Sequence, residues 1–237
     1  MKPIYEPKGA AKEYGDLALN IYTGCPHRCF YCFAPTILRK DREKFHSEIA
    51  PRENIIEETR KQLEREKITG KTIHLCFTCD PYPTGYDSSA TREIIKLVKE
   101  SGNCVQILTK GDGSRDFDLL DKDDWYGITL DGSEFKDGSK TAGADRAEAR
   151  LAALEEANKR GIRTWVSFEP IVYDAGVITL TQYIEKHAPH TRYKYGKLNY
   201  HPSDINWKHC GEWIEGLCKN MGVDYYIKDS LRREMKR

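Results

Sequence analysis

Three cysteines lie close together near the start of the chain: Cys25, Cys29 and Cys32, in the run CPHRCFYC. Thiolates are soft ligands for iron and zinc, and three in so short a loop can cover one face of a compact metal centre. A structural zinc site takes four ligands, and His27, inside the loop, is the nearest fourth candidate. The C-x3-C-x2-C spacing without a nearby fourth cysteine instead favours a four-iron cluster with one iron left open. Zinc and plain buried thiols remain as alternatives.

The elements that must position this loop alternate along the chain. Apolar and β-branched runs predict strands at residues 17–23, 72–78, 104–109, 125–130, 163–168 and 192–198. Helical periodicity predicts helices at 52–66, 88–100, 145–160, 177–187 and 205–221, and a short strand, VDYYIK, follows the last one. Asp145 and Glu148 have the spacing of a capping box. The alternation predicts an α/β fold with a parallel sheet, either a partial (β/α)6 barrel of the TIM type or an open doubly wound sheet.

Polar or metal-ligating side chains follow the predicted strands, and their places favour the barrel. One follows each strand in turn: Cys25, Asp80, Lys110, Asp131, Glu169 and Asn199. The carboxyl ends of barrel strands meet at one mouth, which is where such enzymes carry their site. We expect one domain, 1–237, with its core at about 17–200 and a C-terminal helix–strand–helix segment, 203–237, packed on it.

Composition limits the class of protein. The 237 residues are 39% hydrophobic and 32% charged, with a formal net charge of +1. This balance excludes a polycationic nucleic-acid coat but leaves room for a local basic groove. No run approaches the roughly eighteen apolar residues of a membrane span, and the first residues lack the apolar core of a secretory signal. We therefore expect a cytoplasmic protein, in which eight cysteines favour metal binding over disulfides.

Several stretches together carry a resemblance to a known family. The C-x3-C-x-aromatic-C motif, with Tyr31 at the aromatic position, is similar to that of the radical S-adenosylmethionine (SAM) superfamily. TCDPYP (78–83), LTKGDGSRDFDLL (108–120) and SFEPIV (167–172) resemble the branch that includes spore photoproduct lyase and DNA repair photolyase-related proteins. The resemblance covers nearly the whole chain and implies the partial barrel of a radical SAM core.

The resemblance implies a radical enzyme. In this superfamily three cysteines hold a [4Fe-4S] cluster, and the amino and carboxylate groups of SAM chelate the open iron. One electron, from a flavodoxin- or ferredoxin-like donor, then cleaves the sulfonium and yields a 5′-deoxyadenosyl radical that abstracts hydrogen from a substrate. The cofactors supply the hard chemistry, and the protein orients them.

The resemblance also implies contacts to SAM. The turn from Thr78 to Asp80 would meet the ammonium of SAM, and Lys110 would pair with its carboxylate. The other candidates are Tyr31 for the adenine, Thr129 and Asp131 for the ribose hydroxyls, Glu169 for ribose or substrate, and Asn199 after the sixth strand. Each has a structural alternative: a turn held by Asp-Pro, a solvated lysine or a buried hydrogen bond.

Cys76 and Cys79 form a second, weaker motif. A C-x2-C pair alone is compatible with zinc, a redox pair or a second cluster, but alternation along a regular strand would place the two on opposite faces. Spore photoproduct lyase carries a hydrogen-donor cysteine three residues before the aspartate, where this chain has Phe77. Cys79, directly before Asp80, is the candidate donor here, and this departure weakens the case for a spore lesion as substrate.

The expected substrate is a nucleobase in DNA. The run at 186–197, KHAPHTRYKYGK, interleaves basic and aromatic residues as a groove for a single strand would; a solvated face is its alternative. A second hypothesis keeps the chemistry but takes a peptide, carbohydrate or small metabolite as substrate. A third is a non-catalytic iron–sulfur or zinc module, which would bind metal without cleaving SAM.

Overall fold

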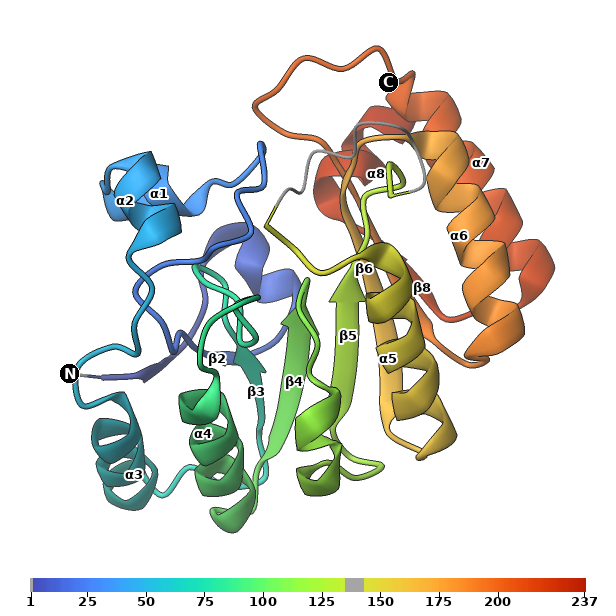
Figure 1. Cartoon of the computed structure of the whole chain (residues 1–237). Helices are drawn as coiled ribbons and strands as arrows, with labels where there is room; N and C mark the ends of the chain where they lie inside the picture. The colour runs from blue at the N-terminus through green and yellow to red at the C-terminus, as the bar shows by residue number, and fades with distance from the viewer. Residues whose placement is uncertain (1, 135–142) are drawn as a thin grey trace.

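The computed structural model describes residues 2–134 and 143–237. In these two ranges eight strands form one sheet, and their spatial order follows the chain from β1 to β8 (Figure 1). β1 (Ile4–Tyr5) runs antiparallel to β2 (Leu17–Leu19). Every later neighbour is parallel, and these strands are β3 (Thr72–Leu75), β4 (Cys104–Thr109), β5 (Trp125–Thr129), β6 (Arg163–Ile171), β7 (Arg192–Lys197) and β8 (Tyr225–Ile227).

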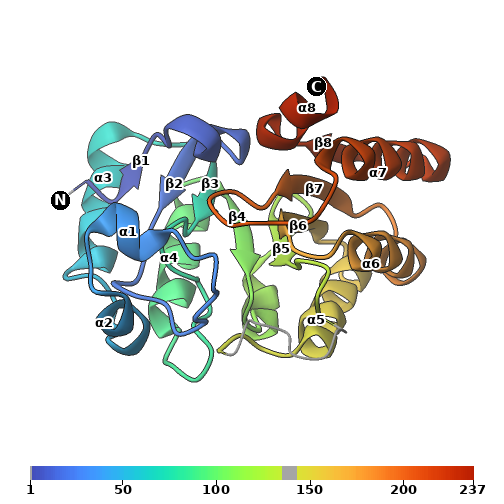
Figure 2. The same ribbon diagram turned by 90° about the horizontal axis from the view of Figure 1, so that it is seen from above.

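The long helices lie on the outer side of this curved sheet (Figure 2). They are α3 (Ile55–Glu66), α4 (Ser89–Glu100), α5 (Ala147–Lys159), α6 (Asp174–His187) and α7 (Trp207–Met221). The sheet is not closed, because β1 and β8 stand at its two ends. The expected α/β fold with a partial parallel barrel is therefore confirmed, and the placement of the long helices argues against a doubly wound sheet.

Shorter elements fill the mouth and the open side. η1 (Gly9–Glu13) lies between β1 and β2, and η2 (Ser114–Leu119) follows β4. α1 (Ala34–Leu38) and α2 (Arg42–Ser47) follow β2, and α8 (Asp229–Met235) follows β8. The C-terminal segment extends the sheet, since β8 pairs with β7 and α8 packs against α7. Across the described ranges, no helix has both the length and the apolar character needed to cross a membrane.

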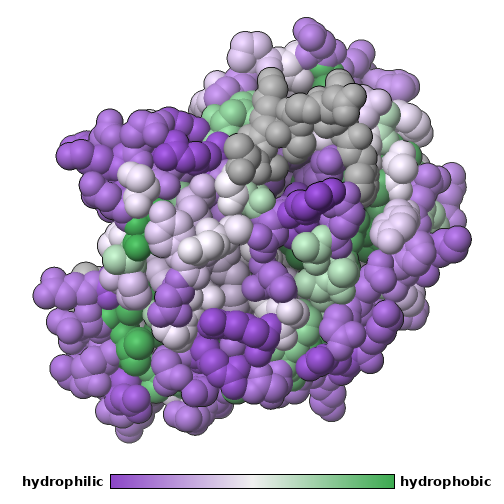
Figure 3. Space-filling view, in the orientation of Figure 1, coloured by the Kyte–Doolittle hydropathy of each residue, from purple (hydrophilic) through white to green (hydrophobic). Residues whose placement is uncertain are grey.

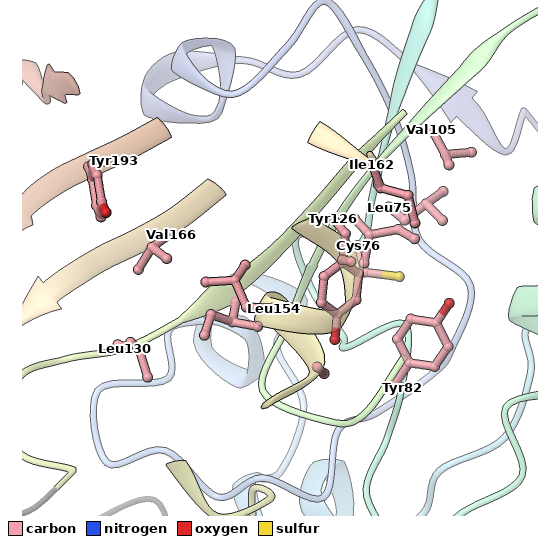
Figure 4. Packing of buried hydrophobic residues seen from close by; sticks show 14 of the residues in the cluster. Leu75, Cys76, Tyr82, Val105, Tyr126, Leu130, Leu154, Ile162, Val166 and Tyr193 are labelled. Carbon is pink, nitrogen blue, oxygen red and sulfur yellow. The ribbon is translucent and has the colours of Figure 1, made fainter. Parts of the chain in front are cut away.

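The two faces of the sheet differ in chemistry, because successive side chains of a strand point to opposite sides. The outward set is apolar and packs beneath the helices; Figure 4 shows part of it, including Leu75, Val105, Tyr126, Val166 and Tyr193. The register places a polar and aromatic set on the inward face, namely His74, Gln106, Trp165, Ser167 and Lys194. The interior of the barrel is therefore lined by side chains that can do chemistry.

Gly127 allows the interior to be filled. A Cβ at this position of β5 would lie 2.2 Å from the indole Nε1 of Trp165 on the neighbouring strand. Without that carbon, the indole lies flat across β5 and donates a 2.8 Å hydrogen bond to the carbonyl of Ile107. A glycine weakens a central strand, but the absence of its side chain makes room for the Trp165 indole.

Several expected boundaries are wrong in detail. The strand expected at 72–78 ends at Leu75, because Cys76 has a φ of 73° and turns the chain. The strand expected at 17–23 ends at Leu19. The expected capping box of Asp145 is absent: the N-cap residue of α5 is Arg146, and no side chain caps the helix. β1, η1, α1 and α2 are too short to give a periodic signal.

Candidate active site

The loop that carries Cys25, Cys29 and Cys32 connects β2 to α1 at the mouth of the barrel. Gly24 lets it start there, since a Cβ would lie 2.3 Å from the carbonyl oxygen of Phe45. All three thiols are free and half-buried. In the described ranges no three His, Cys, Asp or Glu side chains converge closely enough for a single metal ion. Three thiolates on one loop can occupy three corners of a four-iron cluster and leave its fourth iron open.

His27 does not serve as a fourth ligand in this arrangement. Its ring is 2% exposed, and its Nε2 accepts a hydrogen bond from the amide of Thr84. Nδ1 must therefore carry the proton, and it lies 3.3 Å from Oδ2 of Asp80. Both nitrogens are thus engaged, and the imidazole joins the cysteine loop to the turn after β3.

Two thiols of the loop, those of Cys25 and Cys32, have a raised pKa that favours their protonated form until metal binds. Burial, reinforced by the charge of Asp80, raises the pKa of Cys25 well above its usual value. Burial also raises the pKa of Cys32 to about 11. Because a metal ligand must be a thiolate, loading of the loop has to release protons, and the metal must supply the energy for that ionisation.

Asp80 ties the cysteine loop to the ends of β3 and β4. Its carboxylate accepts hydrogen bonds from the amides of Tyr82 (2.8 Å) and Lys110 (2.9 Å) and from the hydroxyl of Thr109. These contacts favour the structural alternative for Asp80. Thr78 lies in the same turn, where its amide is held by the side chain of Asn20 at 2.9 Å.

Lys110 lies at the centre of the mouth and is only 5% exposed. Its ammonium nitrogen makes no hydrogen bond within the described structure. The nearest carboxylate belongs to Asp131, 3.6 Å away, and the ring of Tyr31 lies 5.3 Å from the ammonium. The Tyr31 hydroxyl donates to the same Asp131 oxygen at 3.1 Å. The sequence-predicted trio of Tyr31, Lys110 and Asp131 is thus brought together against the cysteine loop.

The charge of Asp131 persists despite its burial. Burial alone would raise its pKa, but Lys110 and hydrogen bonds from Ser133 outweigh it and hold the pKa below its usual value. Glu134 beside it shows the opposite balance, since burial and the charge of Asp131 raise its pKa. Arg150 closes the group from α5 by donating to the carbonyl of Thr129. The mouth therefore holds an ionised carboxylate next to a buried ammonium that has no hydrogen-bond acceptor within residues 2–134 and 143–237.

Comparison with known proteins identifies the family. The model of the radical SAM superfamily matches residues 19–174, more than half of the chain. This chain belongs to the radical SAM superfamily. Members of that superfamily use a [4Fe-4S] cluster and SAM and need an electron donor, so the expected family and cofactors are confirmed at that level.

Solved structures of similar fold include two kinds of radical SAM protein. Spore photoproduct lyase complexed with dinucleoside spore photoproduct aligns with a TM-score of 0.69 at 13% identity, covering 94% of this chain and 78% of the lyase. A mutant lyase with bound AdoMet and the same dinucleoside gives 0.65 at 15%, covering 89% and 63%. Streptococcus suis SuiB bound to S-adenosylmethionine gives 0.66 at 12%, covering 89% and 50%. At these identities the likeness is one of fold.

Curated relatives match a smaller part. Uncharacterised proteins of Mycobacterium tuberculosis and Mycobacterium bovis are 34% identical over 98 residues, which is 39% of this chain and 29% of theirs. This radical SAM chain thus aligns with less than a third of the length of these relatives.

A second polar group lies inside the barrel of this radical SAM protein, and the sequence did not reveal it. Tyr14, just after η1, donates its hydroxyl to Glu169 and lies 3.1 Å from Ser167. Lys228, at the end of β8, donates to the same Glu169 carboxylate at 2.6 Å. The ammonium groups of Lys194 and Lys228 lie 4.5 and 4.3 Å from the centre of the Tyr14 ring. Glu169 therefore belongs to a buried network rather than standing alone at a strand end.

His74 forms the other part of this interior. Its ring stacks on Phe77 with centroids 4.3 Å apart, and its Nδ1 lies 3.3 Å from the Gln106 amide oxygen. Burial lowers the pKa of His74 to about 3, so the ring is neutral near pH 7. Its Nε2 is buried and has no hydrogen-bond partner among the residues that the structure describes. The signal in the sequence was a lone histidine within an apolar strand.

The expected nucleic-acid groove at 186–197 is wrong. Tyr193 and Tyr195 are fully buried beneath α6, and the Tyr195 hydroxyl bonds Thr181 of that helix at 3.0 Å. Lys194 points the other way, into the barrel, where it donates to the carbonyl of Glu13 at 2.8 Å. The basic and aromatic residues alternate because they lie on opposite faces of one buried strand. Asn199, beyond that strand, bonds the Lys197 carbonyl at 3.1 Å.

Cys76 and Cys79 lie together, contrary to the alternation argument. The strand ends before Cys76, and the turn brings the two thiols close enough to shift one another's pKa. The Cys79 sulfur also accepts the amide of Tyr22 at 3.4 Å. Burial raises the pKa of Cys76 well above its usual value, whereas the pKa of Cys79 is lowered, since hydrogen bonds from Cys76 and the Tyr22 amide outweigh its burial. This pairing turns the Cys79 sulfur toward Cys76 and the end of β2.

The buried Lys194 ammonium predicts a pH dependence of stability. Burial, aided by the nearby charges of Lys228 and Arg192 and opposed by Glu169 and Glu13, lowers its pKa to about 8. The unfolded chain then binds more protons than the folded one between about pH 8 and 10.5, so stability attributable to this lysine rises through that window. Relative to the variant Lys194→Met, the wild type should gain about 2–3 kcal/mol of unfolding free energy across it, measured by urea denaturation.

The control for this prediction is Lys186→Met, because Lys186 is an exposed lysine of α6. Its denaturation curves should follow the wild type at every pH. Parallel pH profiles for wild type and Lys194→Met would show that Lys194 is not desolvated as the structure places it.

Proposed function

We propose that this protein holds a [4Fe-4S] cluster on Cys25, Cys29 and Cys32 and binds SAM beside it as a radical enzyme. The observation that carries the proposal is Lys110: a buried ammonium near Tyr31 of the cysteine loop, with no hydrogen-bond acceptor among the described residues. Burying such a cation is costly unless an anion compensates it, and Asp131 at 3.6 Å does so only in part. The carboxylate of SAM is an anion of the right size and charge for that place.

The residues of the mouth would then divide the work of holding SAM. Lys110 pairs with its carboxylate, and backbone carbonyls of the turn from Thr78 to Asp80 receive its ammonium. Tyr31, fixed by its hydrogen bond to Asp131, would pack on the adenine. Thr129 and Asp131, at the end of β5, would receive the ribose hydroxyls, and Glu169 and Asn199 would contact ribose or substrate. A bound and reduced cluster would supply the electron for the reductive cleavage of SAM.

The barrel interior would exclude water from the reacting groups. The Tyr14 ring lies against the stacked rings of His74 and Phe77, and its hydroxyl donates to the carboxylate of Glu169. A dry chamber protects a reactive radical from side reactions. Cys79 as hydrogen donor remains part of the proposal, and it requires the thiol to turn away from Cys76.

We further propose a nucleobase in DNA as the substrate. Two observations support it: the fold is shared with spore photoproduct lyase complexed with dinucleoside spore photoproduct, and the segment 39–44 after the cysteine loop carries four cations against two anions. Arg39 and Lys40 are exposed in the turn between α1 and α2, and Figure 3 shows this region as mostly hydrophilic. A polyanion would be attracted to such a rim. A peptide is the second candidate, because SuiB bound to its precursor peptide has a similar fold, with a TM-score of 0.63.

The substrate is tested by following hydrogen transfer. The reconstituted, reduced protein is incubated with SAM and oligonucleotides whose bases carry deuterium, either irradiated with ultraviolet light or not. We expect irradiated DNA to raise the yield of 5′-deoxyadenosine and to transfer deuterium into it. An unchanged, unlabelled product with DNA, together with a rise on addition of peptides, would replace the nucleobase by a peptide. Metal binding without SAM cleavage under any condition would instead favour the non-catalytic module.

A further inference from the structure

The short helix α2 contacts the backbone of all three cysteines. The guanidinium of Arg42 donates through Nη2 to the carbonyls of Cys29 at 2.7 Å and Phe30 at 3.2 Å, and through Nη1 to the carbonyl of Cys32 at 3.1 Å. At the other end of the helix, Nδ1 of His46 lies 2.7 Å from the carbonyl of Cys25. A carbonyl can only accept, so this Nδ1 carries the proton and donates it.

We propose that Arg42 and His46 are positioning residues that hold the cysteine loop in its cluster-binding shape and tune the reduction potential of the cluster. This proposal rests on the proposed function, since it concerns the same loop. Neither residue ligates metal; each acts through carbonyls of the ligating segment. Interactions of this kind orient metal ligands and tune the metal.

Helix α2 is itself fixed in place, as it must be if its side chains are to hold the cysteine loop. The side chain of Asp41 caps α2 by accepting the amide of Lys44 at 2.9 Å. Phe45 is 1% exposed, and its carbonyl accepts the amide of Cys25 at 3.1 Å. The side chains of Glu43 and Arg28 add an ion pair at 2.7 Å between the helix and the middle of the loop. Helix α2 therefore contacts the loop at its start (Cys25), its middle (Arg28) and its end (Cys32).

The Arg42 guanidinium can affect the cluster in two ways, which can be separated by experiment. The first is geometric: one planar guanidinium fixes three carbonyls, which a lysine ammonium cannot match in shape. The second is electrostatic: a cation beside a cluster with three thiolates stabilises the extra electron of the reduced state. Because Arg42 is exposed, water and salt screen its charge, so the electrostatic effect is modest and the geometric one matters for loading.

The test compares Arg42→Met with Arg42→Lys and with Lys44→Met. Lys44→Met removes the same charge from the same helix but no hydrogen bond to the loop. In Arg42→Met we expect less iron and sulfide per chain after reconstitution. At a fixed potential we also expect its reduced-to-oxidised cluster ratio to fall about threefold, which is about 28 mV for one electron. Arg42→Lys should recover the ratio better than the loading, and Lys44→Met should match the wild type.

A readout in the metal-free chain keeps this inference distinct from the proposed function. Amide hydrogen exchange over residues 25–32 should be about tenfold faster in Arg42→Met than in the wild type or Lys44→Met. The positioning role of Arg42 would be contradicted if Arg42→Met and the wild type had the same amide exchange rate, iron content and cluster potential. It would also be contradicted if Lys44→Met changed these three quantities as much as Arg42→Met does. If the wild type loads iron but never cleaves SAM, the proposed function is wrong, whereas the positioning role of Arg42 and His46 is unaffected.

The His46 contact has its own pair of variants. His46→Asn keeps an N–H donor near the position of Nδ1, whereas His46→Leu removes it from a buried site. We expect iron loading to fall in His46→Leu and to be largely recovered in His46→Asn, with thermal unfolding used to confirm that both variants fold. Equal loading in two folded variants would exclude a positioning role for His46 and leave that role to Arg42 alone.

Discussion

The variant Cys29→Ala, reconstituted with iron and sulfide beside the wild type, will bind iron only at background level and form no 5′-deoxyadenosine from SAM. The same result is expected for Cys25→Ala and Cys32→Ala. The reason is geometric, because the loop supplies three thiolates and, in the described ranges, His27 is already engaged by Asp80 and Thr84. Removing one thiolate therefore leaves a site with no substitute ligand. Iron and sulfide analysis and the absorbance of the cluster measure the loss.

Cys104→Ala is the matched control for this prediction. Cys104 is a free, half-buried cysteine at the start of β4, at the opposite end of the sheet from the mouth. Its variant should load iron and cleave SAM as the wild type does. If a loop variant keeps the wild-type iron content, the assignment of the three ligands is wrong.

The variant Lys110→Met is expected to bind SAM about thirtyfold or more weakly than the wild type. Lys110 is 5% exposed, and its ammonium makes no hydrogen bond in the part of the chain that the structure describes, so a carboxylate that reaches it would form a desolvated ion pair. Losing one partner of such a pair costs about 2–5 kcal/mol, and about 2 kcal/mol corresponds to this factor in the dissociation constant. Equilibrium dialysis of SAM against the cluster-loaded protein measures the change.

Lys96→Met serves as the control, since Lys96 lies on the exposed face of α4 and pairs with Glu93. Lys110→Arg, which keeps the charge in a different shape, should recover part of the affinity. If Lys110→Met with a full cluster binds SAM as tightly as the wild type, Lys110 does not contact SAM and only pairs with Asp131.

The sequence was most informative where the chemistry is local. Three cysteines within one loop predict a metal site without knowledge of any distant contact, and polar residues after strands predict a mouth. Lys110 and Asp131 were found in this way, and Tyr31 through the motif itself. The structure brings these three residues together because parallel strands bring their carboxyl ends to one rim whatever the details of packing.

The sequence was least informative where distant segments meet. Tyr14 reaches Glu169 across 155 positions, and Lys228 reaches it from the last strand. No pattern along the chain connects these three residues. Periodicity also failed where strands stop early: the turn at Cys76 joins two thiols that regular alternation would separate. In the run at 186–197, alternation was visible but its meaning was not, because a sequence does not say which face of a strand is inside.

The most direct test of the account is the yield of 5′-deoxyadenosine from the anaerobically reconstituted, chemically reduced wild type supplied with SAM. We predict that the wild type forms 5′-deoxyadenosine and that Cys29→Ala forms none. The yield from Lys110→Met should be lower than that of the wild type at subsaturating SAM. A wild type with a fully loaded, reducible cluster that binds SAM and still yields no 5′-deoxyadenosine would contradict the account.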